Sequence, residues 1–176
     1  MSKEVELMAA YLASRSEIKG KKAFQKLAYL AKCIGYPLKA EYRMYLYGPF
    51  SQEVAAELDQ ILARDILRTD DNGISMKEGS LSHHIIQENG ELLRKYSSIL
   101  HNLSELFGNK SPKQLELLVT AHFVSQTLKD HYGITDRNEV IEAIVKAKHP
   151  KFSREEIESA YSEIHVLLGQ TDTKIN

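Results

Sequence analysis

The sequence predicts an α+β protein that is mostly α, and three observations support this fold class. The first is a stretch that changes from strand to turn to helix start within residues 43–51. The second is a pair of strand-like runs, 66–69 and 81–87, which flank a polar loop as in a β-hairpin. The third is a change to purely helical periodicity after Gly90. We therefore expect a winged-helix-like N-terminal half with a small antiparallel sheet and a β-hairpin, followed by a C-terminal helical half.

This order sets the expected domains. Residues 1–90 form the winged-helix-like domain, residues 91–170 form a helical domain packed on it, and residues 171–176 form a flexible polar tail. The strand within 43–51 is expected to complete a sheet with the hairpin. Because so small a sheet is not stable alone, it must pack on helices.

Helices are predicted where apolar residues recur at three- and four-residue steps and a capping residue precedes them. Asp136 with Glu139, and Ser153 with Glu156, match the capping-box pattern. The predicted helices cover residues 3–14, 21–34, 51–63, 91–107, 112–131, 136–149 and 153–168.

The stretch between the second and third predicted helices is the most informative one. Pro49 cannot donate a ladder hydrogen bond and restrains Gly48, so the strand is expected to end there. Ser51 is a good N-cap for the following helix. Tyr45 and Tyr47 alternate along the strand and should share one face. These tyrosines either pack the sheet on a helix or form a binding surface, and the sequence leaves both readings open.

Four segments of the sequence resemble known proteins. The string KAFQKLAYLA, which begins at Lys22, followed by YLYGPFS, which ends at Ser51, resembles the signature of YwgA-like bacterial and archaeal proteins. It is also similar to the Panacea domain of antitoxins and phage-associated proteins. Residues 86–93 are similar to the close of many winged helices, and residues 150–168 resemble the C-terminal half of the YwgA-like set. The Panacea resemblance implies a non-enzymatic protein that neutralises a toxin by binding it or by directing it to proteolysis.

A candidate interaction surface combines this motif with the basic segment 19–43. That segment fits an anion or nucleic-acid patch, and it also fits an ordinary solvated helix face. The candidate residues are Lys21, Lys22, Lys26, Tyr45, Tyr47, Gly48, Pro49 and Ser51.

The sequence offers little for catalysis, so we predict that the protein is not an enzyme. It has no nucleophile–base, metal or cofactor spacing, and we expect no catalytic residue, no cofactor and no metal site. His83 and His84 are adjacent on a predicted strand and should point to opposite faces. His122 is expected at the edge of the core. Cys33, the only cysteine, is expected to be a small buried residue.

Charge decides between the two remaining classes of function. The chain has 23 Lys plus Arg and 24 Asp plus Glu, so no global charge draws it to DNA. In a winged helix the helix at 51–63 would enter the major groove, yet it carries Glu53, Glu57 and Asp59, for which no buried environment is expected. We therefore expect a protein-binding regulator or adaptor. The Panacea resemblance implies that it is antitoxin-like and that its partner is a protein such as a toxin or protease adaptor.

A DNA-binding transcriptional regulator is the alternative function, and the basic segment 19–43 leaves an unusual nucleic-acid mode open. The charged N-terminus lacks the apolar core of a signal peptide, and no apolar run reaches the roughly 20 residues that span a bilayer. We therefore expect a cytoplasmic protein without a membrane partner. The sequence leaves the oligomeric state open.

Overall fold

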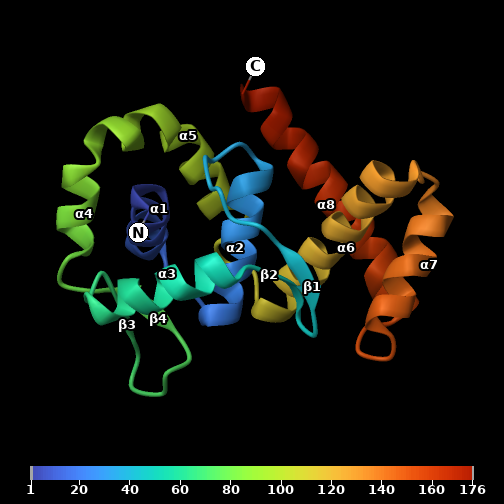
Figure 1. The fold of residues 1–176 in the computed structure, drawn as a ribbon, viewed down its shortest axis with the longest axis horizontal. Coiled ribbons are helices and arrows are strands. Elements are labelled where there is room, and N and C mark those ends of the chain that lie inside the picture. The colour runs from blue at the N-terminus through green and yellow to red at the C-terminus, as the bar shows by residue number, and fades with distance from the viewer. Residues whose placement is uncertain (1, 176) are drawn as a thin grey trace. The chain divides into compact units, whose positions relative to one another are not determined.

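The computed structural model describes residues 2–175, with side chains for residues 2–169. It confirms an α+β fold that is mostly α (Figure 1). The helices of the described chain are α1 Lys3–Arg15, α2 Lys21–Cys33, α3 Gln52–Ala63, α4 Ser82–Glu88, α5 Gly90–Phe107, α6 Pro112–Tyr132, α7 Arg137–Lys148 and α8 Arg154–Ile175. Its strands, which form two antiparallel pairs, are β1 Arg43–Tyr45, β2 Gly48–Phe50, β3 Leu67–Thr69 and β4 Met76–Glu78.

The chain forms two compact units, which divide between Leu115 and Glu116. The first unit therefore extends beyond the boundary at Gly90 that the sequence suggested. The reason is that α5 packs against α1 and α2, where its Leu100 and Phe107 are fully buried.

Helix α1 lies at the centre of the first unit. It contacts α3, α4, α5 and the β3–β4 hairpin, and Figure 1 shows it end-on with α3, α4 and α5 around it. Such a position requires a helix that is apolar on nearly every side. The sequence meets this requirement, because Leu7, Met8, Ala9 and Ala10 are all fully buried.

The order of elements in the first unit is winged-helix-like, but the sheet is completed differently from the prediction. Ile18, in the link between α1 and α2, forms an antiparallel bridge with Met76 of β4, with both N–H···O distances at 2.8 Å. This residue supplies the third strand position beside the β3–β4 hairpin. The 43–51 stretch does not join that sheet and instead forms a hairpin of its own, β1–β2.

The predicted β-hairpin is present as β3–β4, residues 67–78, which we call the wing, but its second strand was predicted in the wrong place. The returning strand is β4, within residues expected to be a loop, and residues 82–87 of the predicted strand are helical, as part of α4. Ile85 of α4 is buried, and α4 packs on α1, so its apolar residues serve a helix face. His83 and His84 accordingly lie on a helix rather than on a strand.

The β1–β2 hairpin also corrects the predicted break at Gly48-Pro49. Both residues belong to β2, and the chain reverses at Leu46-Tyr47, which places Tyr45 opposite Gly48. Gly48 has a φ of 89°, a left-handed conformation that favours glycine. Tyr47 therefore lies in the turn, so the expected strand alternation of Tyr45 and Tyr47 does not apply.

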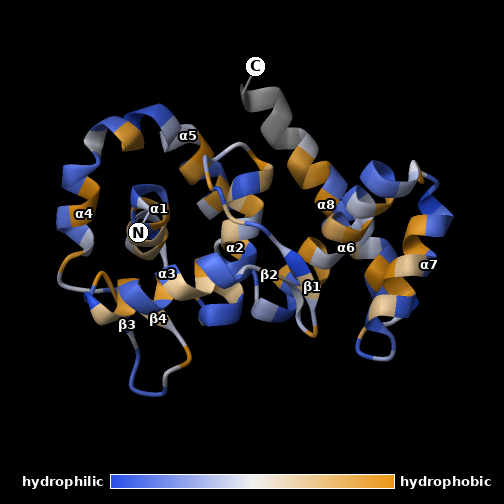
Figure 2. Ribbon diagram, viewed as in Figure 1, coloured by the Kyte–Doolittle hydropathy of each residue, from blue (hydrophilic) through white to orange (hydrophobic). Residues whose placement is uncertain are grey.

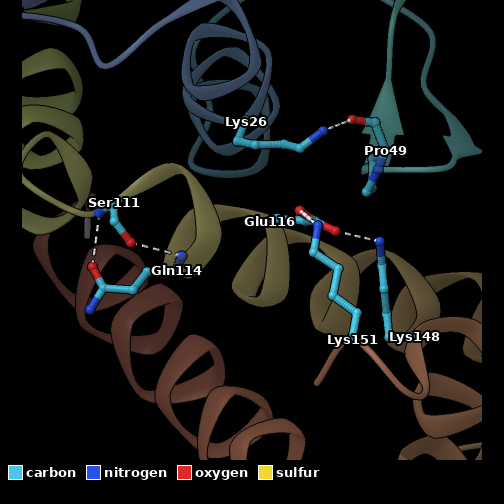
Figure 3. A network of polar contacts seen from close by, with 7 residues as sticks. All are labelled: Lys26, Pro49, Ser111, Gln114, Glu116, Lys148 and Lys151. Atoms are coloured by element: carbon cyan, nitrogen blue, oxygen red, sulfur yellow. Dashed lines mark hydrogen bonds and ion pairs between the residues drawn. The ribbon is translucent and has the colours of Figure 1, made fainter. Parts of the chain in front are cut away.

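The second unit consists of α7, α8 and the part of α6 from Glu116 onward. Glu116 is buried and forms ion pairs with the buried Lys148 at 2.6 Å and with Lys151 at 2.7 Å (Figure 3). These contacts tie the end of α7 and the α7–α8 link to α6. Figure 3 also shows the reciprocal bonds of Ser111 and Gln114 at the start of α6, in the first unit.

The predicted caps of the last two helices are confirmed. Asp136 accepts from the backbone N–H of Glu139, and Ser153 and Glu156 form a reciprocal capping box. Helix α8 continues to Ile175, so the backbone of residues 171–175, predicted as a flexible tail, is helical. Asn176, the last residue of that predicted tail, lies outside the described residues.

Candidate protein-interaction surface

Two adjacent side chains of α2 fasten β2 and the start of α3. Lys26, which is 3% exposed, donates from Nζ to the Pro49 carbonyl at 2.7 Å, as Figure 3 shows. The buried Gln25 donates to the Ser51 carbonyl at 2.8 Å and accepts from the Ser51 N–H at 3.1 Å. A buried polar backbone needs such partners, so the QK pair of the motif fixes the hairpin against α2.

Ser51 then starts α3 as predicted. Its hydroxyl accepts from the Val54 N–H at 3.3 Å and donates to Glu53 at 2.8 Å. The pKa of the Glu53 carboxyl lies below its usual range because its own backbone N–H and the Ser51 hydroxyl donate to it. Lys26, Gly48, Pro49 and Ser51 thus have structural roles that set the position of the hairpin.

The tip of the hairpin, residues 44–47, is apolar and exposed. Met44 is 37% exposed, Tyr45 48%, Leu46 79% and Tyr47 43%. Figure 2 shows hydrophobic colour at the end of this hairpin. The Lys22 ammonium lies 3.3 Å from the centroid of the Tyr47 ring, and the Tyr45 ring meets the Phe50 ring edge-on at 5.4 Å. Both tyrosines are therefore restrained by neighbours of α2 and β2.

A groove of about 550 Å³ lies between this tip, α2 and α3, and we call it the tip groove. Pockets of about 300–1,000 Å³ are typical of binding sites. Its apolar lining comes from Tyr45, Leu46, Tyr47, Phe50, Ala55 and Leu58. Its charged lining comes from Lys21, Lys22, Lys26 and Asp59.

The tip groove brings together six of the eight residues that the sequence singled out; Pro49 and Ser51 support it through their backbones. Sequence reasoning missed Gln25, Leu46 and Asp59. Gln25 and Leu46 stand inside the two motif strings, so the motif itself contained the signal for them. Asp59 pairs with Lys21 at 2.9 Å across the α2–α3 interface, and nothing in the local sequence indicates this contact. That the eight residues form a binding surface stays a prediction.

The elements that would face DNA in a winged helix are acidic. Helix α3 exposes Glu53 and Asp59, and the basic residue at its end, Arg64, pairs with Glu6 of α1. At the tip of the wing, Asp70 accepts from the Ile74 N–H and Asp71 is exposed. Phosphates placed against these elements would be repelled.

One carboxylate departs from the expectation for α3. Burial raises the pKa of Glu57 above its usual value, the charges of Glu6 and Glu4 add to this rise, and a backbone hydrogen bond from Ser2 opposes it. Glu57 lines a separate pocket of about 350 Å³, together with Ser2, Glu4, Lys39 and Glu53. The sequence expected no buried environment for this group, because the packing of α3 near the N-terminus is a long-range feature.

The remaining candidates for chemistry are dispersed. His84 pairs with Glu88 one turn later in α4, and burial lowers the pKa of His122 to about 4, with His165 adding to the effect. Cys33 is exposed at the end of α2, not buried as expected. Among the side chains of residues 2–169, no three His, Cys, Asp or Glu gather as a metal site would require. That the protein is not an enzyme stays a prediction.

Over the residues that the structure describes, no helix combines the length and the apolar character needed to cross a bilayer.

Comparison with known proteins yields one distant relative. No family model matches the chain. The chain is 21% identical over 173 residues to the "Uncharacterized protein YwgA" of Bacillus subtilis strain 168, a match that covers 95% of this chain and 98% of that protein. The similarity extends through both compact units and agrees with the YwgA-like resemblance of the motif. The relation to the Panacea domain stays a prediction.

Proposed function

We propose that this protein is a non-enzymatic binding module, a regulator or adaptor, which captures a partner protein in the tip groove. The observation that carries the proposal is the exposed apolar tip, residues 44–47, held in place over an apolar groove by buried polar contacts. Contiguous exposed apolar surface is unfavourable in water and commonly marks an interaction site.

The way the tip is held also supports binding. Gln25 and Lys26 fix β2 from behind, so the hairpin does not have to be ordered when a partner arrives. A site that is ordered in advance loses less conformational entropy on binding. Gln25 and Lys26 would then contribute to affinity by keeping the hairpin ordered before the partner binds.

The Panacea resemblance suggests the partner class, which is a toxin or a protease adaptor. DNA binding is the alternative function. The acidic surface of α3 disfavours DNA binding, because Glu53 and Asp59 are exposed where the recognition helix of a winged-helix protein carries Arg, Lys, Asn or Gln.

The test compares two exposed apolar residues on different hairpins. We expect Leu46→Asp to abolish capture of the partner from lysate of the native cell while the free energy of unfolding stays within about 0.5 kcal/mol. The matched control is Ile74→Asp, because Ile74 is 65% exposed on the wing and lies outside the tip groove. Capture is scored by mass spectrometry of bound proteins, and a gel shift with genomic DNA fragments is run at two salt concentrations.

Two results would contradict the proposal. If Leu46→Asp retains the whole set of proteins bound by the wild type, the tip groove is not the interface. If the protein shifts DNA fragments and Ile74→Asp removes the shift, the wing contacts DNA and the alternative function is correct.

A further inference from the structure

We infer that the occupant of the tip groove is a segment of the partner protein with an apolar anchor side chain flanked by carboxylates. The inference rests on the proposed function and adds the chemistry of the segment that binds.

The apolar anchor follows from the lining of the groove. Leu58, which is 1% exposed, packs beneath it, and Leu46 and Phe50 lie along its wall. A buried aliphatic or aromatic side chain would remove these surfaces from water, which is the usual role of an anchor residue at an interface. A wholly polar segment would leave the apolar lining of the groove without an apolar partner.

The carboxylates follow from the charges around the apolar lining. Of the lysines that line the groove, Lys26 is buried and donates to the Pro49 carbonyl, whereas Lys21 and Lys22 are exposed. The groove has one carboxylate, Asp59, which already pairs with Lys21. The positive excess would attract an acidic segment and repel a basic one. Lys21 is well exposed, so the attraction should weaken as salt increases.

Lys22 is the lysine expected to contact a carboxylate of the bound segment. Its ammonium lies over the Tyr47 ring, 3.3 Å from the centroid, so the charge is positioned beside the apolar tip. A carboxylate adjacent to the anchor residue could meet Lys22 while the anchor enters the groove. An acidic residue next to the anchor should therefore matter more than one farther along the segment.

A single-stranded nucleic acid is the competing occupant, because exposed tyrosines beside lysines can stack bases. A phosphate chain leaving the groove along α3 would meet Asp59 and then Glu53, both exposed. An acidic peptide can place its few carboxylates on the α2 side, where Lys21 and Lys22 lie. The observations therefore favour the peptide.

The experiment selects short random peptides by phage display on the full-length protein and measures enriched peptides by fluorescence anisotropy. We expect enriched sequences to share Leu, Ile or Phe next to Asp or Glu. Lys22→Glu should raise the Kd by about tenfold or more, since it reverses the charge that faces the carboxylate. If that carboxylate of the peptide is replaced by Lys, the altered peptide should bind the Lys22→Glu variant more tightly than it binds the wild-type protein.

The matched control is Lys77→Glu, the same charge change at an exposed position of β4, which should leave the Kd unchanged. Circular dichroism melts of both variants show whether each is folded. Enriched peptides that lack carboxylates but lose binding on Leu46→Asp would overturn this inference and leave the proposed function standing. No enriched peptide, or a poly-thymidine oligonucleotide whose binding is lost in Lys22→Glu, would overturn both.

Discussion

Lys26 is a cation with almost no exposed surface, and its neighbour Gln25 is as deeply buried. Their shared role is to satisfy the backbone of β2 and of the residue that caps α3. The cost of burying such groups is offset only while their partners remain in place. In this chain the first motif string supplies the side chains, and the second supplies the backbone groups that they bind.

Replacing Lys26 by Met should destabilise the first unit. The Pro49 carbonyl would lose its buried donor, which costs about 1–3 kcal/mol. Lys21→Met is the matched control; Lys21 pairs with Asp59 on the surface, so its loss should cost about 0–1 kcal/mol. Urea unfolding followed by circular dichroism measures both, and equal losses for the two variants would refute the structural role of Lys26.

For single residues, the sequence predicted contacts between positions close along the chain and missed contacts between positions far apart along it. Ser51 was identified as an N-cap because its partner, Val54, is three positions away. The bonds of Gln25 reach Ser51, 26 positions along the chain, and no local pattern encodes them. The role of the tyrosines as part of a groove likewise depends on α2 and α3 lying on either side of them.

Helices with a capping signal or a long apolar stripe were predicted well, and the short helix α4, which has neither, was not. Helices α7 and α8 begin at Asp136 and Ser153 as expected. Helix α4 begins after Leu81, which makes no side-chain cap bond, and its seven residues include β-branched ones that resemble a strand. Packing on α1 decides its conformation, and that information is absent from the local sequence.

The β1–β2 hairpin depends on Gly48, the glycine that directly follows its turn. Gly48 has a φ of 89°, where a side chain strains the backbone, so Gly48→Ala should cost about 1–2 kcal/mol. It should also weaken partner capture, because the strain falls on the tip. Gly90→Ala is the control; a Cβ there meets nothing within 4 Å, and we expect no loss of stability. Similar unfolding free energies for the two variants would contradict this view of the turn.

The whole molecule divides its tasks between two compact units. The tip groove and the wing lie in the first unit, whereas the second contains the buried ion pairs of Glu116. Burial acts to raise the pKa of Glu116, but the hydrogen bonds and charges of Lys148 and Lys151 together outweigh it and hold that pKa below its usual value. The sequence indicated helices here and could not indicate this triad, whose members come from α6, the end of α7 and the α7–α8 link.

Acid should destabilise the molecule first through His122 of α6. Burial, helped by the charge of His165, lowers the pKa of His122 from 6.5 to about 4. Between these values the unfolded chain binds a proton that the folded chain does not, so this contribution is complete above pH 6.5 and is lost as pH falls towards 4. The loss should be of the order of 2–3 kcal/mol. Glu116 acts in the same direction but only below its ordinary value of 4.5, so the two effects occupy different ranges of pH.

The test measures urea unfolding at several pH values between 7.5 and 4.5, by circular dichroism because the chain has no Trp. His122→Gln should flatten the fall in unfolding free energy over this range, whatever its effect at neutral pH. His131→Gln, at an exposed position of the same helix, should leave the slope unchanged. Glu57, whose pKa is raised, acts in the opposite direction, and its contribution cancels when the variants are compared with the wild type. An unaltered slope in His122→Gln would show that His122 is not the group that senses acid.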